Sequence, residues 1–234
     1  GIFYLVFTNV RSWNDGPWKD CPNFLTTAES IEGPWSDPVF MNASGFDASL
    51  FHDDDGKKWF VNMEWDYRQQ GPRQFSGILV QEYDCKAKKL VGKVHKIFLG
   101  TDIGLVEGPH LYKRDGWYYL VCAEGGTSYE HAITCARSKN LFGPYEVHPA
   151  NPLITSYGYD CKLKRAGHGS WCKSPDGKKD YLVYLCGRPI EGTERCVLGR
   201  ETGIAELEWK EGWPWVKQSD GTLKNCPPDY IELK

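Results

Sequence analysis

The feature that most limits how this chain can fold is a unit of about 60 residues that occurs three times. Each copy places a titratable side chain nine residues before the glycine of an Asp-Gly turn: Asp47 before Gly56, Glu107 before Gly116, and His168 before Gly177. The steps between these side chains are 60 and 61 residues. Three copies of one unit that carry Asp, Glu and His at one position indicate a shared site rather than a solvated face.

The repeat also predicts the fold class. Apolar and aromatic runs centred on Tyr4, Phe60, Tyr119 and Leu182 recur at intervals of 56, 59 and 63 residues. A second marker, residues 31–35, recurs 110 residues later as residues 141–145. A parallel β-helix has a much shorter period, and a helical solenoid needs a 3.6-residue pattern that the sequence lacks. The spacing therefore predicts an all-β chain of propeller blades, each with four antiparallel strands.

Blade boundaries follow from the same spacing. Residues 1–45 are expected to form the outer strands of one blade whose innermost strand is absent, and the expected full blades are residues 46–105, 106–165 and 166–216. Gly1 stands three residues before Tyr4, so the chain is expected to begin within a severed Asp-Gly turn. Residues 217–234 lose the pattern and are expected to be a tail or linker.

Composition narrows the classes of partner. The chain has 234 residues, which suits one large domain, and its net charge of -3 gives no basic field for nucleic acid. No apolar run approaches the ~20 residues of a membrane span. Aromatic residues make up 14% of the chain, with ten Trp and thirteen Tyr, which favours a sugar-binding cleft as one use for the surplus.

The nine cysteines give the expected compartment. They are odd in number and include no Cys-x-x-Cys pair, so neither a zinc site nor a complete disulfide framework is indicated. Several lie in apolar runs, where a thiol behaves as a small hydrophobic group. A reducing compartment, the cytoplasm, is therefore favoured over secretion.

The three titratable residues of the repeat are the candidate site. The first strand of each blade lines the channel of a propeller, so Asp47, Glu107 and His168 are expected to surround a common pocket. When two carboxylates lie close together, the more buried one has a raised pKa and can serve as a general acid. Glu107, beside Val106 and Gly108-Pro109, has the more apolar setting. We therefore assign it the proton-donor role and Asp47 the role of tuning its pKa.

Structural roles for these residues stay open at this stage. Asp47 could accept backbone N–H bonds at a strand start, and Glu107 could pair with an arginine. His168 could be a core histidine or a ligand of a metal on the channel axis. Arg200 could be a surface residue paired with Glu201, and the side chain in the Gly-rich segment, Thr127, could be a turn former.

Five ordered segments of the sequence resemble one known family. They are residues 45–53, 107–112, 123–127, 167–170 and 198–202. Together they resemble glycoside hydrolase family 43, in particular its bacterial β-xylosidases. The resemblance implies a five-bladed propeller that hydrolyses glycosidic bonds with inversion. It also implies that the first blade and the innermost strand of the second are absent from this chain, as is a β-sandwich that follows the propeller in the family.

The resemblance implies a role for each matching residue. Glu107 matches the general acid. Asp47 matches the residue that raises the pKa of that acid and helps to orient it. Arg200 matches a residue that binds sugar hydroxyls in the −1 subsite. Phe46 and Thr127 match residues that shape the pocket, and His168 matches a residue at the floor of the pocket. The catalytic base is an Asp on the first blade, and no stretch of this chain matches it, so this chain alone is expected to be inactive.

The expected reaction is removal of xylose from the non-reducing end of xylo-oligosaccharides, with cleavage of α-L-arabinofuranosides as an added activity. The alternatives are an arabinanase or arabinofuranosidase of the same family, and a carbohydrate-binding propeller without activity. No cofactor is expected to be required, and no metal ligand set is assigned. Some family members carry Ca²⁺ on the propeller axis, which leaves a calcium ion near His168 open. The sequence also leaves the oligomeric state open, a homo-oligomer included.

Overall fold

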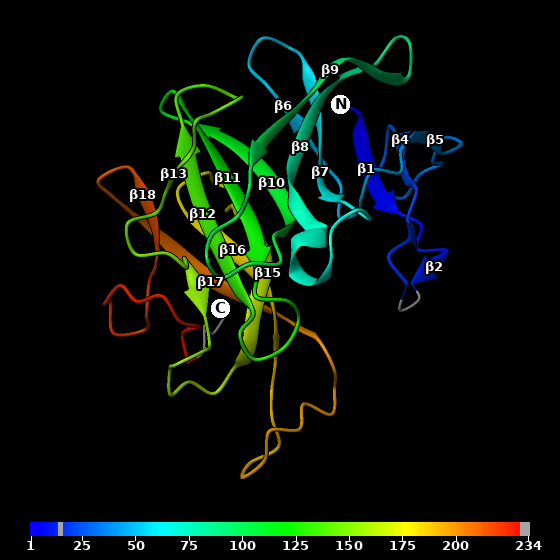
Figure 1. Cartoon of the computed structure of the whole chain (residues 1–234). Helices are drawn as coiled ribbons and strands as arrows, with labels where there is room; N and C mark the ends of the chain where they lie inside the picture. The colour runs from blue at the N-terminus through cyan, green and yellow to red at the C-terminus, as the bar shows by residue number, and fades with distance from the viewer. Residues whose placement is uncertain (14–15, 230–234) are drawn as a thin grey trace. The chain divides into compact units, whose positions relative to one another are not determined.

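The computed structural model describes residues 1–13 and 16–229, which consist of β-strands, loops and the single-turn 3-10 helix η1 (Gly71–Gln74) (Figure 1). The all-β prediction is confirmed. None of the described helical residues forms a helix long and apolar enough to cross a bilayer. In chain order the strands are β1 (Phe3–Thr8), β2 (Ser12–Trp13), β3 (Lys19–Asp20), β4 (Asn23–Ala28), β5 (Val39–Asn42), β6 (Ser49–His52), β7 (Lys58–Trp65), β8 (Phe75–Asp84), β9 (Lys89–Phe98), β10 (Glu107–Arg114), β11 (Trp117–Glu124), β12 (Ala132–Ser138), β13 (Glu146–Val147), β14 (Ile154–Thr155), β15 (Lys164–Lys173), β16 (Asp180–Gly187), β17 (Glu201–Lys210) and β18 (Trp213–Val216).

The strands form four successive sheets in sequence order. These are β1-β4-β5, β6-β7-β8-β9, β10-β11-β12-β13 with β14 beside β12, and β15-β16-β17-β18, while β2 and β3 form a separate ribbon. Neighbouring strands are antiparallel in the first, second and fourth sheets. A sheet of four strands that pair in sequence order has the topology of a propeller blade. The propeller prediction is therefore confirmed at the level of four propeller-like blades.

The hairpin turns explain why the repeat was visible in the sequence. Asp115 and Gly116 both have positive φ, at 50° and 73°, which is the backbone of a type I′ turn. Gly56 and Gly177, at 85° and 72°, end longer turns before β7 and β16, in which Asp55 and Asp176 are not among the residues with positive φ. Asp and Gly are residues that tolerate this left-handed backbone. The Asp-Gly pairs therefore fix where the second strand of each of these sheets begins.

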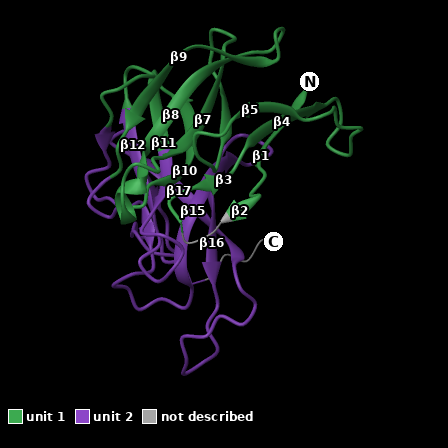
Figure 2. Ribbon diagram, turned by 45° about the vertical axis from the view of Figure 1, so that its right-hand side comes forward, with its two compact units in different colours: residues 1–100, 105–120, 138–145 green, residues 101–104, 121–137, 146–234 purple. Residues whose placement is uncertain are grey.

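Two compact units contain the described residues (Figure 2). Unit 1 comprises residues 1–100, 105–120 and 138–145, and unit 2 comprises residues 101–104, 121–137 and those from 146 onward. A cluster of buried side chains in unit 1 joins the first two sheets: Leu25, Met41, Phe60 and Tyr83. In unit 2 the fully buried large side chains include those of Ile133, Leu153, Leu182 and Tyr184.

The first sheet has three strands, and β1 lies at its edge. Large apolar side chains on β1 are half exposed, with 44% of Phe3 and 48% of Leu5 accessible. An edge strand with unpaired backbone groups and exposed apolar side chains is a surface on which another strand can pair.

The segment that was predicted to be a tail, residues 217–234, is bonded to unit 2 as far as it is described. Lys217 pairs with Leu223 in an isolated bridge, and the Thr155 backbone N–H donates to the Asn225 carbonyl over 3.0 Å. The Cys226 carbonyl accepts a 3.0 Å bond from the side-chain amide of Gln218. Residues 217–229 therefore pack as part of unit 2, and the last five residues of the segment lie outside the described residues.

A buried histidine, His148, links the loop after β13 to β18. Its Nε2 lies 3.0 Å from the Pro214 carbonyl, and its Nδ1 accepts a 3.1 Å bond from the Ala150 N–H. Because a carbonyl only accepts, Nε2 carries the proton and the ring is neutral. Burial is the main cause that lowers its pKa to about 4, and the charge of Arg137 lowers the pKa further while the Pro214 bond opposes the shift.

The free energy of unfolding is expected to depend on pH through this ring. The folded-state pKa lies below the ordinary value of about 6.5, so the stabilisation is complete above pH 6.5 and is lost as the pH falls toward 4. A shift of this size corresponds to on the order of 3 kcal/mol. Urea unfolding of the wild type and His148→Gln at several pH values will show a smaller slope between pH 6.5 and 4 in the variant. Equal slopes would contradict this account.

Candidate active site

The first part of the site lies in unit 1, where the starts of β6 and β10 are side by side. The two strands are in contact, and the Ser49 hydroxyl donates a 2.6 Å hydrogen bond to the Pro109 carbonyl. Ser49 and Pro109 each lie two residues after a predicted site residue, Asp47 and Glu107 respectively. The bond therefore aligns the two predicted carboxylates at matching positions on neighbouring strands.

The two carboxylates differ in their exposure to water. Glu107 is the first residue of β10 and is buried, with 8% of its surface accessible, next to the fully buried Val106. Asp47 is half-buried. The expectation that Glu107 has the drier setting is confirmed. Desolvation disfavours the charged form of a carboxyl group, which is the direction that a proton donor needs.

The backbone at Asp47 is fixed in a rarely used conformation. Its φ is 53°, in the left-handed region, and its N–H donates to the Thr8 hydroxyl over 3.1 Å. His168, at the matching repeat position, has a φ of 45°. Backbone of this kind persists where the surrounding structure imposes it and is common at functional sites. The shared conformation supports the repeat alignment that singled out these two residues.

Phe46, the residue before Asp47, is buried. Its ring centroid lies 6.2 Å from that of Trp65 and 6.0 Å from that of Phe75. Gly45, just before it, has no room for a side chain, because a Cβ there would lie 1.9 Å from the Met63 carbonyl oxygen. This close approach of the chain to β7 positions the Phe46 ring in an aromatic wall.

The remaining predicted residues lie in unit 2. Thr127 is exposed in the turn after β11, which Gly125 and Gly126 enter with φ of 78° and 66°. Arg200 is exposed, immediately before β17. The sequence left open a pair between Arg200 and Glu201. In the structure the Glu201 carboxylate accepts hydrogen bonds from the Arg188 guanidinium instead, at 2.6 and 2.9 Å.

His131 is a site residue that the sequence analysis missed. It precedes β12, is 1% exposed, and its Nδ1 lies 3.2 Å from the Arg165 carbonyl. Burial lowers the pKa of His131 to about 4, and the charges of His168 and Arg200 act in the same direction, against the bond to Arg165. The ring is therefore neutral near pH 7, with its proton on Nδ1. Its Nε2 is buried and has no hydrogen-bond partner among the described residues.

The His131 ring leaves no room for a side chain at Gly167, the residue before His168. A Cβ on Gly167 would lie 2.3 Å from the His131 ring, which is closer than real Cβ contacts occur. A Cβ on Gly169 would lie 2.4 Å from the Val183 carbonyl oxygen. The Gly-His-Gly pattern seen in the sequence is thus a packing requirement on both sides of His168.

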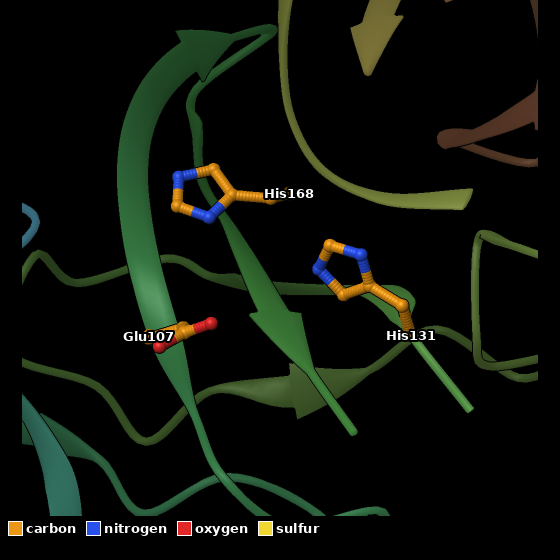
Figure 3. Close-up of side chains that lie close together, drawn as sticks. All are labelled: Glu107, His131 and His168. Carbon is orange, nitrogen blue, oxygen red and sulfur yellow. The ribbon is translucent and has the colours of Figure 1, made fainter. Parts of the chain in front are cut away.

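His131 and His168, both in unit 2, each offer one ring nitrogen, and these two atoms lie within 4.8 Å of each other (Figure 3). Glu107 and the strand that follows His131 belong to the same sheet, through β10, β11 and β12. Imidazole is a ligand that suits zinc or a similar transition metal. Calcium prefers six to eight oxygen ligands, which this set does not supply.

The comparison with known proteins decides the family. The sequence profile of "Glycosyl hydrolases family 43" matches residues 1–214. The chain belongs to glycosyl hydrolase family 43. This confirms the resemblance on which the assignment of Glu107 and Asp47 was based, although the roles of the individual residues stay predictions.

Relatives in family 43 are close in sequence. "Xylosidase/arabinosidase 43B" of Humicola insolens is 60% identical over 92% of this chain and 40% of its own length. "Beta-xylosidase" of Bacillus subtilis is 51% identical over 99% of the chain and 45% of its own length. The crystal structure of a xylan β-1,4-xylosidase from Bacillus halodurans matches with a TM-score of 0.91 and 53% identity, over 100% of this chain and 44% of that one. The chain thus spans less than half the length of these relatives.

The packing of Gly167 gives a test of this part of the site. Gly167→Ala is expected to lower the free energy of unfolding by about 1–3 kcal/mol, because the new methyl group displaces the His131 ring. His131→Ala removes that ring, so adding Gly167→Ala to it is expected to cost much less. A double-mutant cycle in urea measures the difference. Additive costs would show that Gly167 is needed for another reason.

Proposed function

We propose that the protein containing this chain is an inverting β-1,4-xylosidase that removes xylose from the non-reducing end of xylo-oligosaccharides. The observation that carries the proposal is the family 43 match over residues 1–214, together with relatives named for xylosidase activity at 60% and 51% identity. Inverting hydrolysis uses one carboxylic acid to protonate the leaving oxygen and one carboxylate to activate water from the opposite face.

Glu107 is the proposed general acid. Its burial at the start of β10 favours the protonated form, and a second carboxylate in the segment just before β6, Asp47, favours it further because two nearby charges repel. The pair then titrates as a unit. Asp47 helps to orient Glu107 while Glu107 is protonated, and Glu107 becomes charged as the leaving oxygen takes its proton.

The sugar-binding roles extend the proposal to other residues. Phe46 supplies an apolar wall for the pentose ring, and Arg200 binds its hydroxyls with the multiple donors of a guanidinium. Thr127 shapes the rim, and His168 forms the floor of the pocket. The base is an aspartate outside this chain, because no stretch of the sequence matches it.

The finer description of the fold is part of the proposal. The whole catalytic domain is proposed to have five blades, with the first blade and the innermost strand of the second supplied by other parts of the protein. The open edge of β1 and its half-exposed Phe3 and Leu5 support a further strand at that position. A structure of the longer protein with any other element on the β1 edge would contradict this.

An arabinofuranosidase activity is the second candidate, because the Humicola insolens relative is named for both sugars. Nitrophenyl xyloside and nitrophenyl arabinofuranoside, assayed side by side on the longer protein, separate the two. A carbohydrate-binding propeller without activity predicts binding of xylo-oligosaccharides and turnover of neither substrate.

Replacement of the proposed acid is expected to slow the reaction in a way that depends on the leaving group. In the longer protein, Glu107→Ala is expected to lower kcat on xylobiose by about 10²–10⁴. The loss will be much smaller on dinitrophenyl xyloside, because its leaving group departs without a proton. Steady-state kinetics on both substrates measures the difference.

Glu124→Gln is the matched control for Glu107→Ala. Glu124 is another fully buried carboxylate of the same sheet, and it accepts hydrogen bonds from Thr101 and Thr134. Its loss is expected to affect stability without any leaving-group dependence. An equal rate loss on both substrates in Glu107→Ala would remove Glu107 from the acid role.

We propose further that hydrolysis requires no metal ion. The acid and base act directly on the glycosidic oxygen and the water, so the chemistry needs no Lewis acid. Dialysis of the longer protein against a chelator is then expected to leave kcat unchanged. A loss that added calcium restores would instead support a calcium ion near His168, and a loss restored only by zinc would point to the ring nitrogens of His131 and His168.

A further inference from the structure

Asn23, at the start of β4, is a completely buried polar side chain of unit 1 that has no role in the proposed mechanism. Its exposed fraction is 0%. Its side-chain oxygen accepts a 2.7 Å hydrogen bond from the Thr8 hydroxyl. Its side-chain nitrogen donates bonds of 2.8 Å to the Asn42 side-chain oxygen and 2.9 Å to the Gly45 carbonyl. A buried amide with three such partners is held in one orientation, because any rotation would leave polar groups unpaired.

Strand pairing places three of these side chains in one row across the first sheet. Thr8 of β1 and Asn42 of β5 are the residues that pair with Asn23, one on each side. The register of β4 and β5 shifts just after Asn23, and Met41 is the extra residue of β5. Such bulges redirect side chains and are common beside active sites. The row therefore lies where the chain leaves β5 toward Asp47.

The row is bonded to the segment of Asp47 at two points. The Thr8 hydroxyl, which donates to Asn23, also accepts a 3.1 Å bond from the Asp47 N–H. Asn23 itself holds the Gly45 carbonyl, two residues earlier. The φ of Asp47 is 53°, and backbone in this region persists only where its surroundings impose it. The buried amide is therefore part of what imposes that conformation.

The part of the segment before Asp47 is anchored separately, to β7. The Trp65 N–H donates to the Ser44 carbonyl over 2.9 Å, and the Met63 N–H donates to the Phe46 carbonyl over 3.2 Å. Neither bond involves the buried amide. Removal of that amide is therefore expected to loosen Asp47 while the residues before it stay attached to β7.

We propose that Asn23 is a positioning residue that sets the orientation of Asp47 toward Glu107. The inference rests on the proposed xylosidase function, in which Asp47 helps to orient Glu107 and to keep it protonated. The strands that follow Asp47 and begin at Glu107, β6 and β10, are in contact within unit 1. A shift of the Asp47 backbone therefore changes how its carboxylate acts on the acid. Misplacement by about 1 Å can lower a rate by as much as about 10²-fold.

The test compares two leaving groups in the longer protein, because a weakened acid slows only the reaction that needs its proton. In Asn23→Ala, the ratio of kcat on xylobiose to kcat on dinitrophenyl xyloside is expected to fall about five- to twentyfold. A purely structural role would lower both rates equally, through the amount of folded protein. An unchanged ratio, in a variant whose melting transition shows that it is folded, would overturn the inference.

Thr8 gives a second test, which does not require the loss of a buried amide. Thr8→Val removes the hydroxyl that joins Asn23 to the Asp47 N–H and keeps the shape of the side chain. Its ratio is expected to fall about three- to tenfold. Thr8→Ser keeps the hydroxyl and is expected to restore the ratio to within about twofold of the wild type. Equal ratios in Thr8→Val and the wild type would contradict the proposal.

Asn151→Ala is the matched control. The Asn151 side-chain nitrogen also bonds to a threonine hydroxyl, that of Thr134, over 3.1 Å, but the pair lies in unit 2. The ratio in Asn151→Ala is expected to stay that of the wild type. A fall as large as that in Asn23→Ala would show that the loss of any such pair has this effect, and the inference would be wrong.

A double-mutant cycle measures whether Asn23 acts through Asp47. Asp47→Asn keeps the shape of the side chain and removes its charge. Adding Asn23→Ala to Asp47→Asn is expected to change the ratio by less than about twofold, because the carboxylate that Asn23 positions is already gone. Additive losses would overturn the inference and leave the role of Asp47 intact. A wild-type ratio in Asp47→Asn would overturn both, and a wild type that hydrolyses neither substrate would overturn the proposed function with them.

Discussion

The hydrogen bond from the Ser49 hydroxyl to the Pro109 carbonyl is the contact on which the arrangement of the acidic residues depends. It joins the first strands of two successive sheets at points 60 residues apart, which is the length of the repeat. Loss of this bond would free the start of β6 to move relative to the start of β10, and with it the segments that carry Asp47 and Glu107. The chemistry proposed for the pair therefore relies on a structural bond that neither carboxylate makes.

The sequence predicted those features that depend on local backbone chemistry. Asp-Gly pairs favour turns, and each glycine lies within three residues of the strand that follows it, so counting residues from the glycines singled out Asp47, Glu107 and His168. Apolar runs that recur about every 60 residues also depend on the local sequence, and they predicted the blades.

Features that depend on contacts between distant segments were not predicted. His131 precedes a third strand rather than a first one, so it has no counterpart in the repeat, and only the structure shows its ring against Gly167. Likewise, Arg188 reaches Glu201 across a sheet, whereas sequence proximity had suggested Arg200. The segment after β18 was predicted to be a linker because it has no periodic pattern of apolar residues. Its contacts with unit 2 are hydrogen bonds of Asn225 to the chain near Thr155, which produce no such pattern.

The left-handed backbone at Asp47 and His168 limits which amino acids can occupy those positions. Branched and bulky side chains are strained there, while Gly, Asn, Asp and His are tolerated. Half of that short set can exchange protons with water. Backbone geometry alone thus restricts these two positions to a few residue types, and Asp and His are the members of that set whose side chains can transfer a proton.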